Sequence, residues 1–287
     1  MPPKRPITLI PNLLTLTNAG LGLLAISKAI DALSSAATPA LFERHLEMAC
    51  WLVLLAGVFD ALDGKIARLM NAFSDLGAQL DSFADAITFG VAPAFIAKAL
   101  LEHEGLAHPR INFVCAAAFT LMAVLRLARF NTETEPDEAS HAFFKGLPSP
   151  AAAGMVVSTV LMYLSLGGSI EVEAGEPTPL GRGLQVLPLA WREALTTYLL
   201  LPTVLVLLPL LGLLMVSRVR YVHMVSSITS RQGVEGLVVV VLFVLGLYLA
   251  PVLFLFGFGV FYVFGTLLRV AAQRPHKTDL GSEDLAA

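Results

Sequence analysis

The stretch DALDGKIARLMNAFSDLGAQLDSFAD, residues 60–85, places four carboxylates inside sequence that is otherwise apolar enough to cross a membrane. The four are Asp60, Asp63, Asp81 and Asp85. On membrane-insertion scales each charge at the centre of a bilayer costs about 2.5–3.5 kcal/mol, so four bare carboxylates would cost on the order of 10 kcal/mol. The sequence therefore predicts that bound groups compensate these charges.

The spacing of the aspartates predicts how they are arranged. In a helix, Asp60 and Asp63 are three residues apart, and Asp81 and Asp85 are four apart, so each pair shares one face. The polar residues between the two pairs include Ser74, which is suited to the N-cap of a second helix. We expect the two helices to meet as an antiparallel hairpin whose four carboxylates face one cleft.

Clustered carboxylates favour a divalent cation, because hard ions such as Mg²⁺, Mn²⁺ and Ca²⁺ prefer oxygen ligands. A set of transmembrane salt bridges is the alternative. Against it, Arg68 is the one basic residue on the face of the first pair, since Lys65 falls off that face. The small residues Gly64, Ala67 and Gly77 leave room for a ligand to lie against the backbone.

The pattern DxxDGxxAR, eight residues, then GxxxDxxxD is the signature of the CDP-alcohol phosphotransferases, and every fixed position of it is filled. The chain therefore resembles that family. The resemblance implies two divalent ions, Mg²⁺ or Mn²⁺, with Ca²⁺ also able to bind. It assigns these ions to Asp60, Asp63 and Asp81, with Asp85 completing the metal site and acting as general base. The remaining residues of the pattern are implied to bind CDP-diacylglycerol: Gly64, Ala67, Arg68 and Gly77.

Four further stretches resemble one branch of the family, the bacterial and archaeal phosphatidylserine synthases. They are IPNLLTLTNAGLGLLAI (10–26), DSFADAITFGVAPA (81–94), RLARFN (126–131) and FKGLPSPAAA (144–153). The resemblance covers most of residues 7–165. It implies CDP-diacylglycerol and L-serine as substrates, phosphatidylserine and CMP as products, and a homodimer of transmembrane helices.

RLARFN and FKGLP bring Arg126, Arg129, Asn131 and Lys145 to the ends of two predicted spans. Basic residues at such positions commonly anchor a helix by reaching the lipid headgroups. Arg126 and Arg129 are three residues apart and share one helix face, so both can also turn inward to a carboxylate or phosphate, which the planar guanidinium suits. All four residues are candidates for binding the acceptor.

Composition indicates an all-α, polytopic membrane protein. Of 287 residues 56% are hydrophobic and 14% charged, and mean hydropathy is +0.75. The formal charge of −3 comes without a basic stripe of interleaved aromatics, so we expect no nucleic-acid partner. Cys50 and Cys115 lack metal-ligand spacing and are expected in the core. Residues 1–273 are predicted as one integral membrane catalytic domain, and residues 274–287 as a short polar cytoplasmic tail.

Runs of about 17–25 mostly apolar residues predict about eight spans. These runs cover residues 7–30, 48–70, 76–101, 111–130, 148–166, 195–217, 234–249 and 252–270. The last two are one run, divided at Ala250-Pro251 because proline breaks a helix. The first run exceeds the ~7–15 apolar residues of a secretory signal and is interpreted as a retained span. Residues 167–193 are expected to form an external loop.

The distribution of positive charge predicts the orientation. With the N-terminus inside, thirteen of the nineteen lysines and arginines lie on the inner side or at the adjoining helix ends. This agrees with the positive-inside rule. The aspartate cleft is therefore predicted to open to the cytoplasm from the cell membrane.

Two alternatives remain open from the sequence. A sister enzyme would share the donor but use glycerol phosphate, inositol phosphate or choline as acceptor, and residues 60–85 do not separate these because they handle only the donor. A cation transporter would use intramembrane aspartates as its pathway. A transporter would not need Gly64, Ala67, Arg68 and Gly77 at these spacings.

Overall fold

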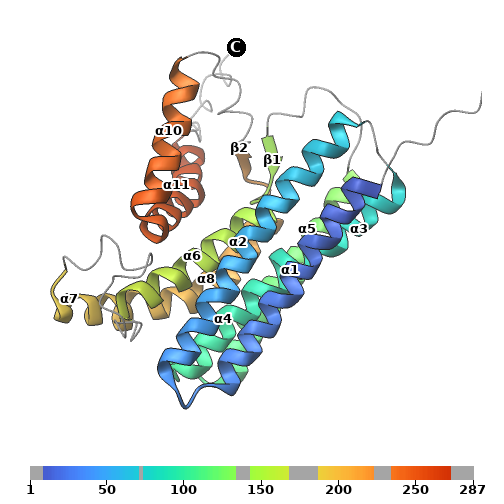
Figure 1. Cartoon of the computed structure of the whole chain (residues 1–287). Helices are drawn as coiled ribbons and strands as arrows, with labels where there is room; N and C mark the ends of the chain where they lie inside the picture. The colour runs from blue at the N-terminus through green and yellow to red at the C-terminus, as the bar shows by residue number, and fades with distance from the viewer. Residues whose placement is uncertain (1–8, 71–73, 134–142, 168–186, 223–233, 273–287) are drawn as a thin grey trace, which may run out of the picture.

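The structure is a computed structural model that describes residues 9–70, 74–133, 143–167, 187–222 and 234–272 (Figure 1). As predicted, these residues are overwhelmingly helical. The helices are α1 (Leu9–Ser34), α2 (Pro39–Leu69), α3 (Asp75–Asp85), α4 (Ala92–His103), α5 (Pro109–Glu133), α6 (Ser149–Gly167), α7 (Leu189–Ala194), α8 (Leu201–Val216), α10 (Val234–Leu249) and α11 (Pro251–Ala272). Short π-helical segments join α3 to α4 (η1, Ala86–Val91) and α7 to α8 (η3, Leu195–Leu200).

Seven helical stretches within the described residues are long and apolar enough to cross a membrane, which makes the chain an integral membrane protein. The predicted break in the last apolar run is confirmed, since α10 ends at Leu249 and α11 begins at Pro251. α10 has only 16 residues, fewer than the about 20 that a crossing usually needs. Within the described residues, seven of the eight predicted spans therefore have the length and hydropathy of a membrane crossing.

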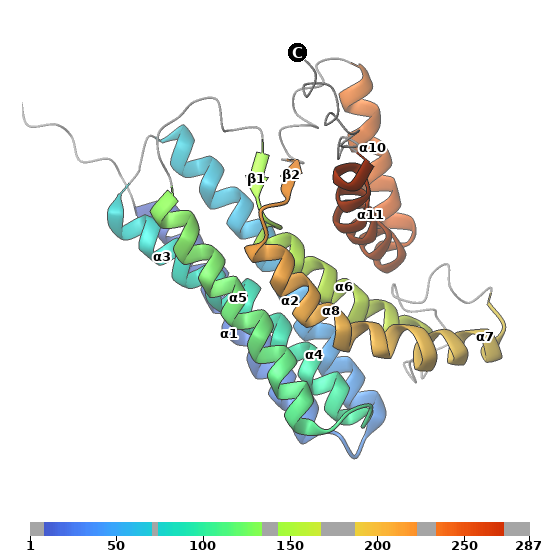
Figure 2. The same ribbon diagram turned by 180° about the vertical axis from the view of Figure 1, so that it is seen from behind.

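The long helices form a bundle, and α10 and α11 form a hairpin to one side of it (Figure 1). α1 packs along α2, and α5 packs along α8. α11 packs against α6. Seen from behind, the ends of α2 and α5 gather at the same end of the bundle as the strands β1 and β2 (Figure 2). That end also carries α3, and so all four aspartates of the signature.

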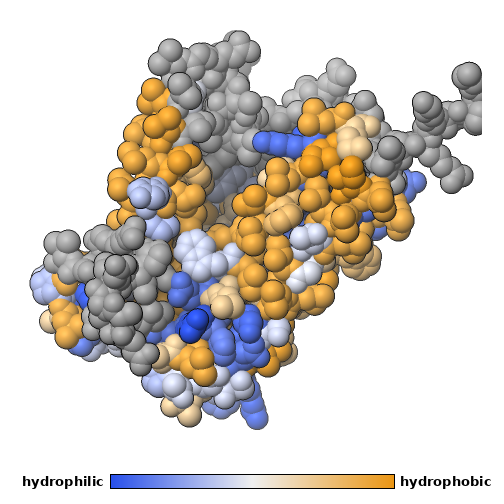
Figure 3. Space-filling model, in the orientation of Figure 1, coloured by the Kyte–Doolittle hydropathy of each residue, from blue (hydrophilic) through white to orange (hydrophobic). Residues whose placement is uncertain are grey.

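The core centres on α4 and α6, whose small residues are almost fully buried. Small residues let helices approach closely in a membrane. Gly22 on α1 is the clearest case, because a Cβ there would lie 2.9 Å from Cα of Thr88 in η1. Many outward-facing positions are apolar, and Figure 3 shows apolar side chains over α10 and the upper part of α2, with hydrophilic ones near the lower end of α2. These faces are suited to lipid.

Both π-helical segments end two residues before a proline. η1 is followed by Pro93 and η3 by Pro202, each at the second position of the next helix. Proline has no N–H and its ring clashes with the preceding turn, so the turn before it widens. Oγ1 of Thr120 lies 3.2 Å from the carbonyl oxygen of Gly90 in η1 and 3.1 Å from that of Ala116, and its single proton serves one of them at a time. The sequence analysis predicted continuous helices here and missed both segments.

A two-stranded sheet, also not predicted, ties the start of α6 to the end of α8. β1 (Phe143–Lys145) pairs antiparallel with β2 (Arg220–Val222), and Phe144 lies opposite Tyr221. Gly146 follows β1 with a positive φ of 84°, and its N–H donates to the carbonyl of Val219 at 2.8 Å. Any side chain here would collide with the carbonyl of Met215, so the turn requires glycine.

Two sequence predictions fall largely outside the described residues. The polar tail, residues 274–287, lies wholly outside them, as does most of the predicted loop, residues 168–186. The end of that predicted loop is helical instead, because α7 begins at Leu189. The sixth membrane-length stretch therefore starts six residues before the predicted 195.

Candidate active site

Three aspartates converge where α2 approaches α3. Asp60, Asp63 and Asp81 each bring one carboxylate oxygen within 4.8 Å of the other two. Asp63 is buried, with 5% of its surface exposed. The ion pairs found among the described residues, Lys28 with Asp31 and Lys98 with Glu102, lie elsewhere. The geometry therefore favours a cation over the alternative of salt bridges, because like charges this close repel each other strongly.

Asp85 supplies a fourth carboxylate, one helical turn beyond Asp81. Its side chain lies within hydrogen-bond reach of Asp60. Its oxygen Oδ1 is buried and has no hydrogen-bond partner among the described residues. Buried polar atoms in proteins are rarely left unpaired, so an unpaired acceptor in this position indicates that a ligand or metal completes the site.

α1 contributes to the site, which the sequence analysis missed. Oγ1 of Thr15 lies 3.0 Å from Oδ2 of Asp63 and 3.0 Å from the carbonyl oxygen of Pro11. Both are acceptors, so the single hydroxyl proton serves one of them at a time. One turn further on, Asn18 is fully buried and its side-chain amide has no partner among the described residues. The signal was present in the sequence as Asn12, Thr15 and Asn18, three polar residues spaced by three in an apolar run.

The predicted hairpin of two helices is only partly right. α2 contacts η1 and α4, which continue α3, but it does not pack along α3 itself, whereas α1 packs against both α2 and α3. Helix periodicity fixes which residues share a face, but it does not say which helix that face meets. The predicted cap is confirmed, since the side chain of Ser74 accepts a hydrogen bond from the N–H of Gly77 at 3.0 Å.

The small residues of the signature have different surroundings. A Cβ at Gly64 would meet nothing within 4 Å, so open space lies beside it. A Cβ at Gly77 would lie 3.0 Å from Oγ of Ser74 and 3.2 Å from Oδ1 of Asn12, so this glycine serves close packing of α3 on α1. Ala67 is half-buried. Arg68 is exposed, and its Nε donates to the carbonyl of Gly64 at 3.0 Å.

The two arginines of RLARFN face different partners. Nη1 of Arg126 donates to Oγ of Ser149 at 3.1 Å, and the guanidinium interacts electrostatically with Asp85. Nη1 of Arg129 instead approaches the carbonyl of Val216, at the end of α8, at 3.5 Å. Arg126 is therefore linked electrostatically to the carboxylate of Asp85.

The other two acceptor candidates lie at the same end of the bundle. Nδ2 of Asn131 donates to Oγ of Ser82 at 2.8 Å, next to Asp81 in the sequence. This contact joins the end of α5 to α3. Lys145 is the last residue of β1, and its backbone pairs with Arg220, while its side chain is outside the described part of the chain.

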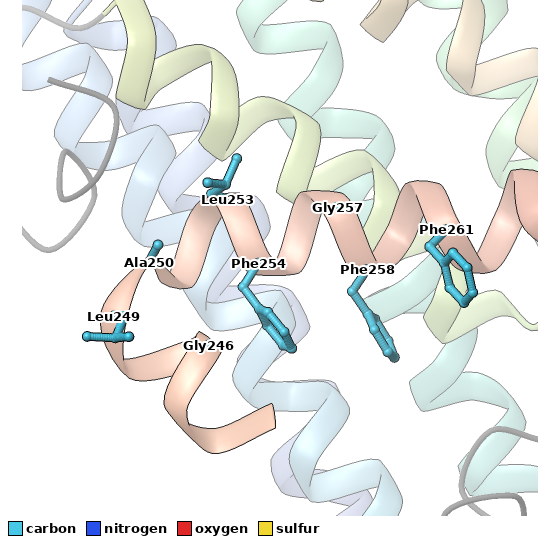
Figure 4. Close-up of a pocket in the computed structure, with 8 residues that line it drawn as sticks. All are labelled: Gly246, Leu249, Ala250, Leu253, Phe254, Gly257, Phe258 and Phe261. Carbon is cyan, nitrogen blue, oxygen red and sulfur yellow. The ribbon is translucent and has the colours of Figure 1, made fainter. Parts of the chain in front are cut away.

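A second hollow lies along the α10–α11 hairpin and has a different character. Figure 4 shows Phe254 and Phe258 of α11 projecting to the same side. The residues that line it are glycines or apolar: Gly246, Leu249, Ala250, Leu253, Phe254, Gly257, Phe258 and Phe261. A lining without polar side chains offers nothing to position a charged substrate, so the aspartate cluster remains the candidate active site.

Comparisons with known proteins agree with this choice. The chain is similar to the CDP-diacylglycerol–serine O-phosphatidyltransferase of Helicobacter pylori, with 38% identity over 172 residues, which cover 59% of this chain and 65% of the relative. The protein of the same name from Bacillus subtilis is 33% identical over 54% of this chain and 76% of its own length. The archaetidylserine synthase of Methanothermobacter thermautotrophicus is 36% identical over 53% and 58%.

The family comparison covers the site itself. The match to the Helicobacter protein spans slightly less than two thirds of that relative's length. The family model described as CDP-alcohol phosphatidyltransferase matches residues 8–176, more than half of the chain. This range includes α1 to α6 and all four signature aspartates. The protein therefore belongs to the CDP-alcohol phosphatidyltransferase family.

Proposed function

We propose that this protein transfers the phosphatidyl group of CDP-diacylglycerol to the hydroxyl of L-serine, giving phosphatidylserine and CMP. The observation that carries the proposal is the convergence of Asp60, Asp63 and Asp81 within 4.8 Å, beside the unpaired oxygen of Asp85. The family supplies the CDP-linked donor. The names of the relatives support serine as acceptor.

The donor set fits two divalent ions, Mg²⁺ or Mn²⁺, because all of its members are carboxylates. Asp60, Asp63 and Asp81 would hold the metal, and Asp85 would complete the site. Bound there, the metal would neutralise the pyrophosphate and stabilise the charge that develops on departing CMP. Without it, the anionic donor would be repelled by four carboxylates.

The remaining chemistry belongs to the chain's own residues. A serine hydroxyl is a weak nucleophile at neutral pH, so a carboxylate within reach of its proton accelerates attack, typically by about 10²–10⁴-fold. Asp85 takes this proton as the hydroxyl oxygen bonds to the phosphorus next to the diacylglycerol. The bond from that phosphorus to the CMP oxygen breaks, and CMP leaves with the electron pair. Open space beside Gly64 admits the donor.

We also propose an orientation in the membrane and an oligomeric state. The site would open to the cytoplasm of the cell membrane, which is supported by the basic residues at that end of the bundle, among them Lys65, Arg68 and Arg126. Family resemblance leads us to propose a homodimer as well. Labelling of single cysteines introduced at the two ends tests the orientation, and the mass of the solubilised protein tests the dimer.

An acceptor screen tests the proposed activity directly. Purified protein with Mg²⁺ or Mn²⁺ and CDP-diacylglycerol is expected to release CMP when L-serine is added, and to stop after metal chelation. Asp63→Asn should abolish release, whereas Asp31→Asn, a control at the far end of α1 where Asp31 pairs with Lys28, should not. Stimulation by glycerol 3-phosphate, inositol 1-phosphate or choline, with serine inert, would refute the assignment of the acceptor.

A further inference from the structure

Arg126 carries an unused hydrogen-bond donor beside the catalytic carboxylates. Its Nη1 donates to Oγ of Ser149 at 3.1 Å, but its Nε is buried and has no partner among the described residues. An arginine N–H is a strong donor, and leaving one unpaired away from water costs free energy. The position therefore indicates that an acceptor group, supplied by a ligand, completes it.

Tyr221 carries a second unused donor. The residue is fully buried, and its hydroxyl has no partner among the residues that the structure describes. Pairing of β1 with β2, in which Tyr221 lies opposite Phe144, holds its backbone in place. Burial raises the pKa of Tyr221 to about 12, so the hydroxyl keeps its proton at neutral pH and remains a donor.

Tyr262 of α11 connects these two residues. It is buried, with 8% of its surface exposed, and its ring lies 5.7 Å from that of Tyr221, tilted by 48°. It also interacts electrostatically with Arg126, which in turn interacts with Asp85. Electrostatic interactions thus link Asp85 to Arg126 and Arg126 to Tyr262, and a ring contact links Tyr262 to Tyr221. Arg126 and Tyr221 each carry an unpaired donor.

We infer that Arg126, Tyr221 and Tyr262 form a subsite that receives the carboxylate of the amino-acid acceptor beside Asp85. This inference rests on the proposed function, because it takes serine as the acceptor. A carboxylate accepts hydrogen bonds from both a guanidinium and a phenol, and charge-assisted bonds of this kind are the stronger class. Tyr221 and Tyr262 lie beyond residues 8–176, so the part of the chain outside the family match contributes to acceptor selection.

Removal of a single hydroxyl tests the subsite. Tyr221→Phe keeps the ring and its packing on Tyr262, so the protein should fold with an unchanged melting temperature. We expect KM for serine to rise at least about tenfold while KM for CDP-diacylglycerol stays the same, because a bond to a charged group is lost. Tyr248→Phe, at a side chain that is 71% exposed on α10, is the matched control and should behave as wild type.

Acceptor discrimination separates a binding role from a structural one. Ethanolamine is serine without its carboxylate, so the preference of the enzyme for serine over ethanolamine should fall in Tyr221→Phe and Tyr262→Phe by a similar factor. If wild type depends on serine but both variants keep the KM and the preference, the subsite is refuted and the proposed function stands. If wild type releases no CMP with serine, the proposed function is refuted, and the serine subsite that depends on it is refuted as well.

Discussion

Thr15 on α1 and Asp63 on α2 are in hydrogen-bond contact, Oγ1 to Oδ2 at 3.0 Å, across 48 residues of sequence. Both side chains are buried. A partner of this kind fixes the rotamer of a carboxylate, and groups that orient metal ligands tune affinity for the metal. The first helix is therefore part of the site and not only a membrane anchor.

Loss of this contact should weaken metal binding. We expect Thr15→Val to lower the affinity for Mn²⁺ by about 10- to 100-fold, and Thr15→Ser, which restores the hydroxyl, to recover it. Electron paramagnetic resonance of free Mn²⁺ titrated with purified protein measures the affinity without turnover. Thr17→Val is the control, because Thr17 is half-buried and, among the described residues, its hydroxyl bonds within its own helix, to the carbonyl of Leu13. Equal affinities in wild type and Thr15→Val would refute the role.

Removing the proposed base should separate binding from chemistry. Asp85→Asn keeps the shape of the side chain and loses the proton acceptor, so turnover should fall at least about 10²-fold. Binding of the CDP-lipid and of metal should change much less, because the other three aspartates remain. Single-turnover CMP release, compared with equilibrium binding of the donor, makes the measurement. Near-normal turnover at saturating metal would show that another group takes the proton.

The open space beside Gly64 predicts a variant that folds but does not bind donor. Leucine is favourable in a membrane and a Cβ at this position would meet no atom within 4 Å, so Gly64→Leu should insert and keep its melting temperature. Its bulk should abolish binding of CDP-diacylglycerol. The contrast is Gly22→Leu, which would collide with Thr88 and should destabilise the fold itself. Wild-type donor affinity in a folded Gly64→Leu protein would rule out this position as part of the donor pocket.

Much of the fold could be predicted because it follows from local composition. Apolar runs of membrane length gave seven helical stretches and the break at Pro251. The π-helical segments before Pro93 and Pro202 were missed. A proline predicts that the preceding helical turn is distorted, but it does not predict whether the helix kinks there or widens into a π-helix. The pairing of Phe144 with Tyr221 was missed for another reason, since two short segments far apart in sequence carry no local signal for each other.

The residues of the candidate site also divide into those that could be predicted from local sequence and those that could not. Its aspartates were found because helical spacing places Asp60 with Asp63 and Asp81 with Asp85, and a charge in an apolar run is conspicuous. Thr15 was missed because a threonine is ordinary in a membrane helix, where its hydroxyl can bond the preceding turn. Tyr221 was missed because its burial depends on tertiary packing of β2 against α11, which sequence periodicity does not reveal.

The turn after β1 should depend on glycine for two reasons that can be measured separately. Gly146→Ala should lose stability for two reasons: alanine disfavours the positive φ of 84°, and its Cβ would clash with the carbonyl of Met215. Gly105→Ala is the matched control, because Gly105 has a φ of 64° but open space around its Cβ. The control should lose about 1–2 kcal/mol of stability and Gly146→Ala clearly more. Thermal or denaturant unfolding in detergent gives both values, and equal losses would show that the turn accommodates a methyl group.

The two arginines of RLARFN should differ in their effect on the acceptor. The sequence alone makes both Arg126 and Arg129 candidates for binding the acceptor. The structure separates them, because Arg126 interacts with Asp85 while Arg129 approaches the carbonyl of Val216. Arg126→Ala should therefore raise KM for serine by on the order of 10- to 100-fold with little change in KM for CDP-diacylglycerol, since a charge-assisted bond is lost. Arg129→Ala should act mainly on stability, through the end of α8. Acceptor titrations at saturating donor, paired with melting temperatures, make the comparison. A larger serine defect in a stable Arg129→Ala protein than in Arg126→Ala would move the acceptor site to the other side of α5.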